Sequence, residues 1–315
     1  MEWIEATVKT HTESVEAISE ILIAAGSKGV SIEDPADFFQ LNEEQLQWLK
    51  VNQSELFSNE DVFVKAYFTE EEWNDQLQAD ILQKLEALKE FGLELGKNTL
   101  EISQMGQSDW ADAWKAYYFP VRVSRYLTIV PSWIDYKASQ EHEIIIKLDP
   151  GMAFGTGTHP TTQLSLMALE QLVRGGETIL DVGTGSGVLS IAAKALGVCD
   201  SYAFDIDELA TRVSKENISL NEFASDIKIS ENNLLEGIDL PADIIIANIL
   251  AEILVKMPQD AYRNLKDKGH LILSGIIDSK KDSVVDAYVE HGFYLKQSMQ
   301  LGDWNCLIFT KGNED

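Results

Sequence analysis

Cysteine and histidine are both scarce in this sequence. The 315 residues include two cysteines, Cys199 and Cys306, and five histidines. Neither cysteine belongs to a CxxC pair and the histidines share no helical face, so the usual ligand patterns of a metal site are missing. We therefore expect no metal centre and no disulfide framework. Each cysteine stands beside apolar residues, which favours buried packing for both thiols and a reducing compartment, the cytoplasm.

Long apolar runs are missing as well. No stretch approaches the ~18–20 apolar residues that a membrane-spanning helix needs. The first residues, Met1–Glu5, carry neither the basic segment nor the apolar core of a secretory signal peptide. The sequence thus predicts an ordinary globular protein of the cytoplasm without a membrane partner, and its length favours two domains.

Positive charge is in short supply. There are 25 lysines and arginines against 52 acidic residues, with a net charge of −27 and a pI near 4.4. Nucleic-acid binding depends on basic residues that neutralise phosphates, so we expect no direct contact with nucleic acid. A strongly negative protein attracts basic partners and speeds their association. Soluble proteins without such a partner are often acidic too, and composition alone leaves both interpretations open.

The first third of the chain reads as a small α+β domain. Hydrophobic periodicity predicts strands over 3–8, 29–34, 61–68 and 100–103 and helices over 12–25 and 69–91, the second capped by Thr69. The polar stretch 35–59 reads as an insertion or a long loop. A β-α-β-β-α-β order predicts a ferredoxin-like domain over residues 1–105.

A linker helix is expected over residues 106–120. Trp110 and Trp114 stand four residues apart there, on one face of a helix. A binding role for the two indoles is conceivable, but buried aromatic residues usually serve packing. We expect the helix to dock between the domains.

The remaining residues, 121–315, alternate strands with amphipathic helices. Strands are predicted over 127–130, 143–147, 178–182, 201–204, 227–229, 243–247, 270–274, 293–299 and 306–310, and helices over 161–173, 188–196, 209–220, 252–265 and 282–290. Apolar strands alternating with helices indicate a doubly wound, mostly parallel sheet that is covered on both faces.

The strongest motif is the glycine-rich loop that follows strand 178–182. Asp181 ends the apolar strand, and Gly183, Gly185 and Gly187 alternate before a helix begins. Glycines allow a sharp turn and a close approach to a ligand, and a helix N-terminus attracts anions. The spacing lacks the third glycine of the dinucleotide fingerprint. It suits the carboxylate of a methionine moiety better than a pyrophosphate.

Two polar residues follow neighbouring strands. Asp205 falls about 20 residues after the glycine loop, where an acid binds ribose hydroxyls, with Ile206 beside it. Asp205 could instead cap the next helix, a role open equally to Asp207. Asn248 ends strand 243–247, at the edge of the sheet where ligands bind, although it too could cap a helix.

The segment Asp149–Thr162 is rich in glycine and threonine, which suits a loop that closes over a ligand. Its candidate cofactor contacts are Phe154, Gly155, Thr156, Gly157, Thr158 and Thr162. His159 lies in the same loop, where a single histidine more often forms local hydrogen bonds than performs catalysis.

The run Asp149–Thr162 resembles the signature of the PrmA family, which methylates the stalk-base protein of the large ribosomal subunit (protein eleven of that subunit). Residues 181–187 and 248–251 are similar to the family's cofactor motifs, in the same order. The resemblance implies a seven-stranded Rossmann-like class I methyltransferase domain over 121–315, with S-adenosylmethionine as cofactor. It implies cofactor contacts from Thr162, Gly183, Asp205 and Asn248, closure of 154–158 over the cofactor, and substrate recognition by the N-terminal domain.

The expected reaction is transfer of a methyl group to lysine side chains and the N-terminal α-amine. No Asp, Glu or His in the motifs stands out as a base, so we expect desolvation of the amine and hydrogen bonding around Asn248, the candidate catalytic residue. Other functions stay open: methylation of a small metabolite, a nicotinamide-dependent enzyme, a sensor of S-adenosylmethionine, and an RNA methyltransferase. The missing third glycine disfavours the second, and the acidic pI disfavours the last.

Overall fold

The chain forms two compact units, residues 1–119 and 120–315. The computed structural model describes residues 3–11, 14–27, 29–33, 61–91, 95–105, 118–149, 157 and 159–312. The expected insertion 35–59 and the two tryptophans of the expected linker helix lie outside these described residues. None of the described helices is both long and apolar enough to cross a membrane.

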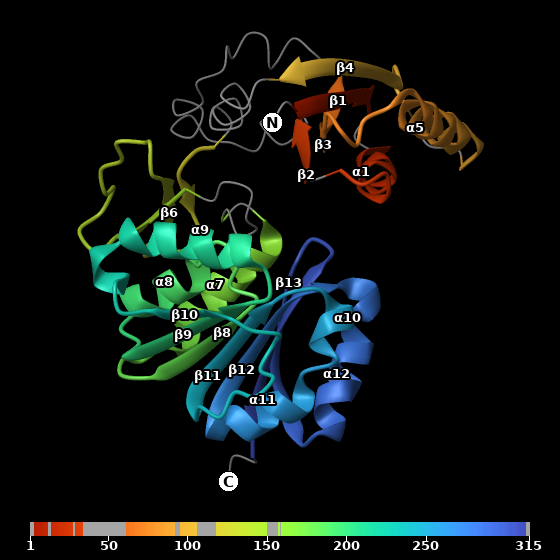
Figure 1. The fold of residues 1–315 in the computed structure, drawn as a ribbon. Coiled ribbons are helices and arrows are strands. Elements are labelled where there is room, and N and C mark those ends of the chain that lie inside the picture. Colours follow the sequence, from red (N-terminus) through yellow and green to blue (C-terminus); the bar gives the residue numbers. More distant parts are fainter. Residues whose placement is uncertain are drawn as a thin grey trace. The chain divides into compact units, whose positions relative to one another are not determined.

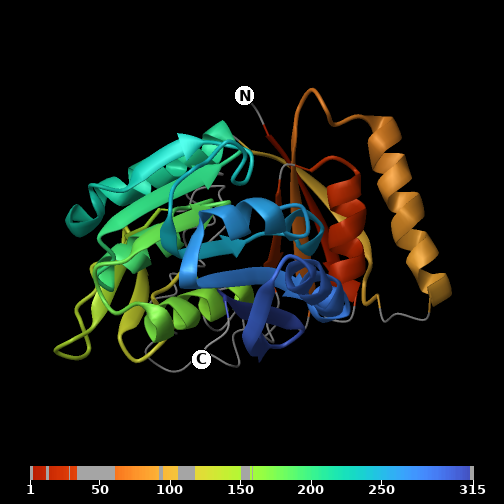
Figure 2. The same cartoon turned by 90° about the horizontal axis from the view of Figure 1, so that it is seen from below.

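The N-terminal unit is one antiparallel sheet with two helices. Its elements are β1 (Trp3–Thr10), α1 (Val15–Ala24), β2 (Gly29–Glu33), β3 (Val62–Thr69), α5 (Asp75–Ala87) and β4 (Thr99–Met105). The strands lie in the order β2-β3-β1-β4, and each neighbouring pair is antiparallel. Figures 1 and 2 show α1 and α5 side by side against the sheet.

Alternation along the strands builds the core of this unit. In β3 every second residue is buried, beginning at Val62 and ending at Phe68, because successive side chains point to opposite faces. Ile18 of α1 and Ile81 of α5 are fully buried in the same cluster. Both helices therefore cover the apolar face of the sheet.

Helix α5 begins later than the sequence predicts. Thr69 ends β3, and its hydroxyl donates to Glu72 in a turn, at 2.8 Å. Asn74 is the residue that caps the helix, since its side chain accepts from the backbone N–H of Leu77 at 3.0 Å. The expected cap at Thr69 is wrong because the chain makes one additional turn before the helix.

The C-terminal unit contains a seven-stranded mixed sheet. Its strands are β8 (Thr178–Val182), β9 (Asp200–Asp205), β10 (Lys228–Glu231), β11 (Ala242–Asn248), β12 (Leu265–Ile277), β13 (Phe293–Leu301) and β14 (Trp304–Lys311). They lie in the order β10-β9-β8-β11-β12-β14-β13. The five strands from β10 to β12 are parallel, and β14 is antiparallel to both of its neighbours. The α/β fold predicted from the sequence is confirmed.

Helices cover this sheet on both faces. Helices α7 (Pro160–Leu172), α8 (Val188–Ala195) and α9 (Glu208–Ser219) lie on one face, and α10 (Ala251–Leu254), α11 (Pro258–Asn264) and α12 (Lys281–Glu290) lie on the other (Figure 1). Four consecutive residues of β11, Ile244–Ala247, are buried, as expected for a strand covered on both sides. The single helix expected over 252–265 is two helices, because Pro258 starts a new one.

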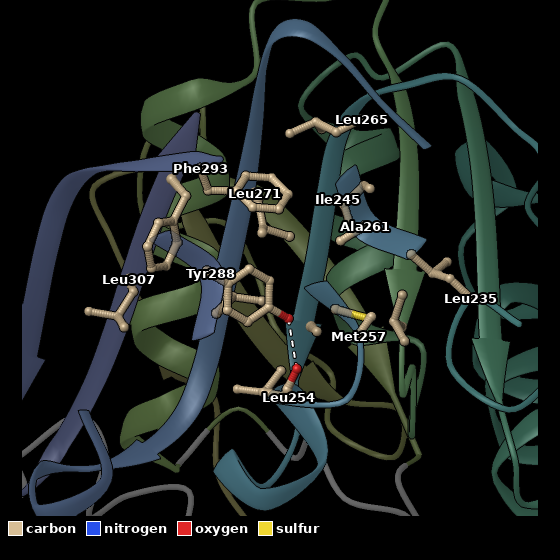
Figure 3. Close-up of a cluster of buried hydrophobic side chains, with 14 of the residues drawn as sticks. Leu235, Ile245, Leu254, Met257, Ala261, Leu265, Leu271, Tyr288, Phe293 and Leu307 are labelled. Carbon is tan, nitrogen blue, oxygen red and sulfur yellow. Dashed lines mark hydrogen bonds between the residues drawn. The ribbon is translucent and has the colours of Figure 1, made fainter. Parts of the chain in front are cut away.

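Aromatic packing joins α12 to the sheet. Tyr288 is fully buried, and its ring lies 5.5 Å from the rings of both Phe293 and Phe309. Its hydroxyl donates to the backbone carbonyl of Leu254, at the end of α10, over 2.9 Å (Figure 3). One tyrosine thus ties α12 to the short helix that follows β11.

The strands expected over 127–130 and 143–147 are outside the central sheet. They form a separate sheet of β5 (Val121–Arg122), β6 (Leu127–Pro131) and β7 (Ile144–Leu148), in which β6 and β7 are parallel. Of the two thiols expected to be buried, Cys306 is buried and Cys199 is exposed, because Cys199 lies in the turn before β9.

Candidate functional site

The strand order reverses between β8 and β11, and a cavity lies at the carboxyl ends of these strands. Its volume is ≈ 530 Å³, within the usual range of small-molecule sites. It is lined by the loops after β8, β9, β10 and β11, the start of α7, and Gly275 and Trp304 from β12 and β14. A reversal point of an open α/β sheet is where such ligands bind.

The glycine loop has a left-handed backbone at each alternate position. The φ angles of Gly183, Gly185 and Gly187 are 73°, 54° and 83°, which side chains other than glycine rarely adopt. Backbone N–H groups of Gly183 and Thr184 both donate to the carbonyl of Phe204, at 2.8 and 3.0 Å. The loop is therefore held against β9, and Val188 and Leu189 from the first turn of α8 line the cavity.

Asp181 lies beneath this loop and is fully buried. Its Oδ2 accepts from the hydroxyls of Thr184 and Ser190, at 2.7 and 2.8 Å. Its Oδ1 has no partner among the described residues. Burial, together with the charge of Asp205, raises the pKa of Asp181 to about 6 although both hydroxyls lower it. The structure thus places Asp181 where it supports the loop, not among the residues that line the cavity.

Asp205 lies at the end of β9 and lines the cavity. Its two oxygens accept from the N–H groups of Gly185 and Asp207, at 2.9 and 3.0 Å. Asp207 is the residue that caps α9, since it accepts from Leu209 N–H at 2.9 Å. Beside them the side chain of Ile206 is 68% exposed at the cavity, an apolar surface next to a carboxylate. The capping role, which the sequence left open to both residues, therefore belongs to Asp207, and Asp205 lines the cavity.

Asn248 ends β11 and is only 9% exposed, yet one of its side-chain polar atoms has no described hydrogen-bond partner. Its Nδ2 lies 3.5 Å from the hydroxyl of the buried Thr162, at the outer limit of a hydrogen bond. Its Oδ1 is buried without a partner in the described part of the chain. The cap of α10 is Leu250, so Asn248 is not a helix cap. An unsatisfied buried acceptor on a cavity wall costs about 1–3 kcal/mol unless a ligand supplies a donor.

His159 has a structural position at the cavity edge. Its ring accepts from Thr161 N–H at 3.3 Å, which caps α7, and its Nδ1 lies 2.7 Å from the Thr161 hydroxyl. Burial lowers its pKa, and its ring packs edge-on against Trp304 with centroids 4.9 Å apart. These local contacts agree with the sequence interpretation of a locally bonded histidine.

Part of the predicted closing loop lies outside the described residues, namely Phe154, Gly155, Thr156 and Thr158. Gly157 is described and buried, with φ of 92°. A Cβ at Gly157 would come 2.4 Å from Cδ1 of Ile129, so the Ile129 side chain would have to move to admit a larger residue.

Several cavity residues escaped the sequence analysis. Asn232, Asn233 and Leu234 follow β10, and the Asn232 side chain donates to the carbonyl of Leu234 at 2.9 Å. Leu234 holds a left-handed φ of 51°, which strains a leucine. The signal that could have found them is their position after a strand, at the same sheet edge as Asp205 and Asn248. Trp304 and Gly275 gave no comparable local signal.

One asparagine on α9 and one just after its end also escaped notice. The amide of Asn217, fully buried, donates to the carbonyl of Ser186 at 2.8 Å and accepts from Asp149 N–H at 2.7 Å. One turn later, Asn221 bonds both the N–H and the carbonyl of Lys147, at 3.0 and 2.8 Å. Through these bonds both side chains pair with the backbone at the end of β7, and Asn217 also connects that backbone to the glycine loop.

The site offers a definite set of chemical contacts. The N-terminus of α8 attracts an anion, Asp205 accepts hydrogen bonds, Ile206 and Leu234 form apolar walls, and Asn248 presents a free acceptor. This set fits a molecule with a carboxylate, a ribose and a base. No group of residues suited to hold a metal ion occurs in the described part of the chain.

The sequence matches known proteins along its whole length. The family model "Ribosomal protein L11 methyltransferase (PrmA)" matches residues 2–312. A ribosomal protein L11 methyltransferase of Enterococcus faecalis is 51% identical over 100% of both chains, and one of Streptococcus equi subsp. zooepidemicus is 50% identical over 99% of this chain and 97% of its own. A crystal structure of a ribosomal protein L11 methylase from Lactobacillus delbrueckii subsp. bulgaricus is 38% identical, with a TM-score of 0.60, over 62% of this chain and 100% of that one.

Proposed function

The chain belongs to the ribosomal protein L11 methyltransferase (PrmA) family, and from this membership we propose that it methylates amino groups of ribosomal protein L11 with S-adenosylmethionine as methyl donor. The family resemblance predicted from the motifs is confirmed by the match over residues 2–312. The acceptors in this proposal are lysine side chains and the N-terminal α-amine.

The observation that carries the proposal is the unpaired Oδ1 of Asn248. It is buried on the wall of a cavity that fits the cofactor, at the switch point of the sheet. Among the described residues, the Asn248 side chain bonds to Thr162 and not to an Asp, Glu or His, so in this proposal the acceptor amine arrives neutral or loses its proton to water. An amide oxygen is suited to accept a hydrogen bond from such an amine and to aim its lone pair.

Protonation of the amine is the main chemical obstacle. S-adenosylmethionine, when bound, supplies a methyl group on a positively charged sulfur. The amine nitrogen bonds to the methyl carbon as the carbon–sulfur bond breaks, and the nitrogen loses one proton to water. A lysine with a pKa of ~10.4 pays ~4 kcal/mol to be neutral near pH 7.4, whereas an α-amine pays under ~1 kcal/mol. Burial beside Asn248 disfavours the ammonium form and so lowers this cost.

We assign the cofactor contacts residue by residue. Asp205 receives the ribose hydroxyls, the glycine loop with Gly183 and Gly185 receives the carboxylate, and Ile206 covers the base. Thr162 and Asp181, which the sequence predicts as cofactor contacts, are both fully buried: Thr162 lies against the Asn248 amide, and Asp181 bonds the glycine loop. Residues 154–158 complete the assignment, as the sequence predicts: Phe154, Gly155, Thr156, Gly157 and Thr158.

The N-terminal unit is proposed as the substrate-recognition domain, ferredoxin-like in type and joined by a linker over 106–120. Its β-α-β-β-α-β order and its strand order β2-β3-β1-β4 support that classification. Residues 1–119 contain 24 acidic residues against 8 lysines and no arginine. Such an excess of negative charge suits a basic protein substrate.

The same charge argues against other partners. We propose that the chain binds neither nucleic acid nor membranes directly, since the acidic residues that attract a basic protein repel phosphates. We propose the cytoplasm as its location, since the proposed substrate is a ribosomal protein.

Intact mass spectrometry tests the proposal. Ribosomal proteins from cells that lack this enzyme are incubated with it and S-adenosylmethionine. We expect protein L11 alone to gain methyl groups, at a rate that falls several-fold as salt rises, because charge speeds encounter. No gain in mass on any ribosomal protein, with cofactor binding retained, would overturn the substrate and point to a small molecule or a sensor. A rate indifferent to salt would mean that the acidity is incidental.

A further inference from the structure

The segment that carries Asn248 passes between two glycines. Gly183, after β8, and Gly275, near the end of β12, both have left-handed φ angles, 73° and 82°. A Cβ on Gly183 would come 2.3 Å from Cγ2 of Ile249, and one on Gly275 would come 2.4 Å from the Ile249 carbonyl oxygen. Carbon atoms in contact normally stay ~3.5–4.0 Å apart. Ile249 therefore occupies a slot, here called the Ile249 slot, that exists only because both flanking residues are glycine.

The two walls of the Ile249 slot act on different parts of Ile249. Gly183 approaches the side chain, where the next nearest atom is Cβ at 3.8 Å. Gly275 approaches the backbone, with the carbonyl carbon at 2.9 Å and the nitrogen at 3.1 Å. A side chain can rotate or be truncated, but a backbone must move as a whole. Because Ile249 N is bonded to Asn248, any displacement by Gly275 reaches the Asn248 amide.

The surrounding structure holds the slot rigidly. The pairing of β12 with β14 shifts register between Leu273 and Ile276, which brings Gly275 out of regular pairing. Ser274 donates from its hydroxyl to the carbonyl of Thr161 at 3.0 Å, which fixes that irregularity to α7. At the other end of the segment, Tyr288 holds the carbonyl of Leu254 (Figure 3). Residues 248–254 are thus fixed from both sides.

We propose that Gly275 is a positioning residue for methyl transfer. It sets the backbone at Ile249 and thereby keeps the Asn248 amide at the cavity wall. Gly183, through the Ile249 side chain, links the same segment to the glycine loop. The inference rests on the proposed function for its kinetic test, and on the geometry of residues 248–254 alone for its structural test.

The experiment compares Gly275→Ala with a matched control, Gly176→Ala. Gly176 has a similar left-handed φ of 91°, and no described atom would lie within 4 Å of its Cβ. It lies before β8, at the opposite end of the sheet from the cavity. Both variants therefore place alanine at a similar left-handed φ, and only Gly275→Ala also carries the clash. Three quantities are measured in each: kcat on protein L11, affinity for S-adenosylmethionine by calorimetry, and hydrogen exchange of a peptide over 248–254.

For Gly275→Ala we expect kcat to fall about 100-fold below that of Gly176→Ala, because a displacement of ~1 Å has such an effect on a positioned group. Affinity for the cofactor stays within several-fold of the control, and exchange over 248–254 accelerates about 10-fold or more, because a displaced segment loses local protection. Equal kcat and equal exchange in both variants would overturn the proposal. If the unmodified enzyme methylates no ribosomal protein, the proposed function fails, and exchange over 248–254 still decides the role of Gly275.

Truncation of Ile249 distinguishes the clash expected at Gly183 from the clash expected at Gly275. Ile249→Ala removes the Cγ2 atom that a Gly183 side chain would strike, so it should restore most of the exchange protection and cofactor affinity lost in Gly183→Ala. The same truncation should not restore Gly275→Ala, whose clash is with the backbone. If Ile249→Ala restored the kcat and exchange protection lost in Gly275→Ala, the loss would be due to side-chain packing alone. That result would contradict a positioning role for Gly275.

Discussion

Two carboxylates at the amino end of the central sheet differ in their hydrogen bonding from two polar side chains at its carboxyl end. At the amino end, Glu177 accepts from the N–H groups of Arg174 and Gly175, at 2.6 and 2.8 Å. Asp243 likewise accepts from Thr178 N–H at 2.9 Å. At the carboxyl end, Asp181 and Asn248 each keep a buried oxygen without a described partner. Both amino-end carboxylates are thus bonded within the fold, whereas the free oxygen of Asn248 lies on the wall of the cavity.

The pKa values of two aspartates follow the same division. At the amino end, hydrogen bonds from Lys266 and Thr178 outweigh burial and lower the pKa of Asp243. At the carboxyl end, burial and the nearby Asp205 raise the pKa of Asp181 to about 6. One carboxylate is thus stabilised in its charged form by the fold, and the other is destabilised. Mutations of the polar side chains at each end of the sheet test which of them govern stability and which govern ligand binding.

The largest expected effect comes from a matched pair of asparagines. Asn248→Ala should lower turnover about 10²–10³-fold, the usual cost of removing one positioned polar group, with little loss of stability. Asn264 is its counterpart at the amino end, buried, with its oxygen accepting from Leu240 and its nitrogen donating to Ile238 and Asp260. Asn264→Ala should destabilise by about 1–3 kcal/mol with kcat unchanged. Kinetics and denaturation of both variants check this, and full turnover in Asn248→Ala would break the comparison.

Asp181 should produce the next effect, in stability against pH. Its folded pKa, about 6, lies above the ordinary value of 3.8, so the folded state binds more protons between these values. Its contribution is complete below pH 3.8 and is lost as pH rises through 6, by up to about 3 kcal/mol. Asp181→Asn removes this loss, so the variant should gain stability relative to the unmodified protein between pH 4 and 6. Denaturant unfolding at several pH values measures the difference, and a constant difference would contradict the raised pKa.

Asp205 and Asp207 separate binding from capping at the carboxyl end. Asp205→Ala should weaken binding of S-adenosylmethionine about 10–100-fold, since hydrogen bonds to charged groups contribute about 1.5–3 kcal/mol. Asp207→Ala removes the cap of α9 and should cost about 1 kcal/mol of stability while affinity stays nearly unchanged. Calorimetry and thermal unfolding of both variants provide the test. Equal losses of affinity would show that the division of roles is wrong.

The smallest effect is expected at Asp243. Asp243→Asn removes the charge paired with Lys266 at 2.8 Å, a partly exposed pair, and should cost about 1 kcal/mol at neutral pH. Because the folded pKa is lowered, this contribution is present above the ordinary pKa and is lost as pH falls through the folded value. The pH trend is thus opposite in sign to that of Asp181. Unfolding curves at pH 7 and pH 3 check it, and kcat at pH 7 serves as the control.

Sequence reasoning located elements whose signals are local. The glycine loop, Asp205 and Asn248 each follow an apolar strand directly, and the structure brings all three to one cavity. Pro258 is a local signal for the break in the expected helix 252–265, because proline favours the first position of a helix. The apolar spacing alone predicts one continuous helix there. Local signals therefore account for the order of elements and for most of the cavity edge.

Other features depend on partners that are distant in sequence. Gly275 has no neighbouring motif. It must be glycine because Ile249, in the loop after β11, lies against it. Asn217 reads as a surface helix residue, until the fold places the Ser186 carbonyl and Asp149 N–H on either side of it. The separate sheet of β5, β6 and β7 is equally invisible, because periodicity identifies strands but not their neighbours.

By itself, the sequence determined the alternation of strands and helices, the glycine loop and the family, because hydrophobic period and motif spacing are properties of neighbouring residues. Only the tertiary structure decided which polar groups stay unpaired. Asn248 and Asn264 are the same residue type at opposite ends of the sheet, one with a free oxygen and one fully bonded. The physical reason is that satisfaction of a buried polar group depends on what the fold packs against it, and no local pattern of residues carries that information.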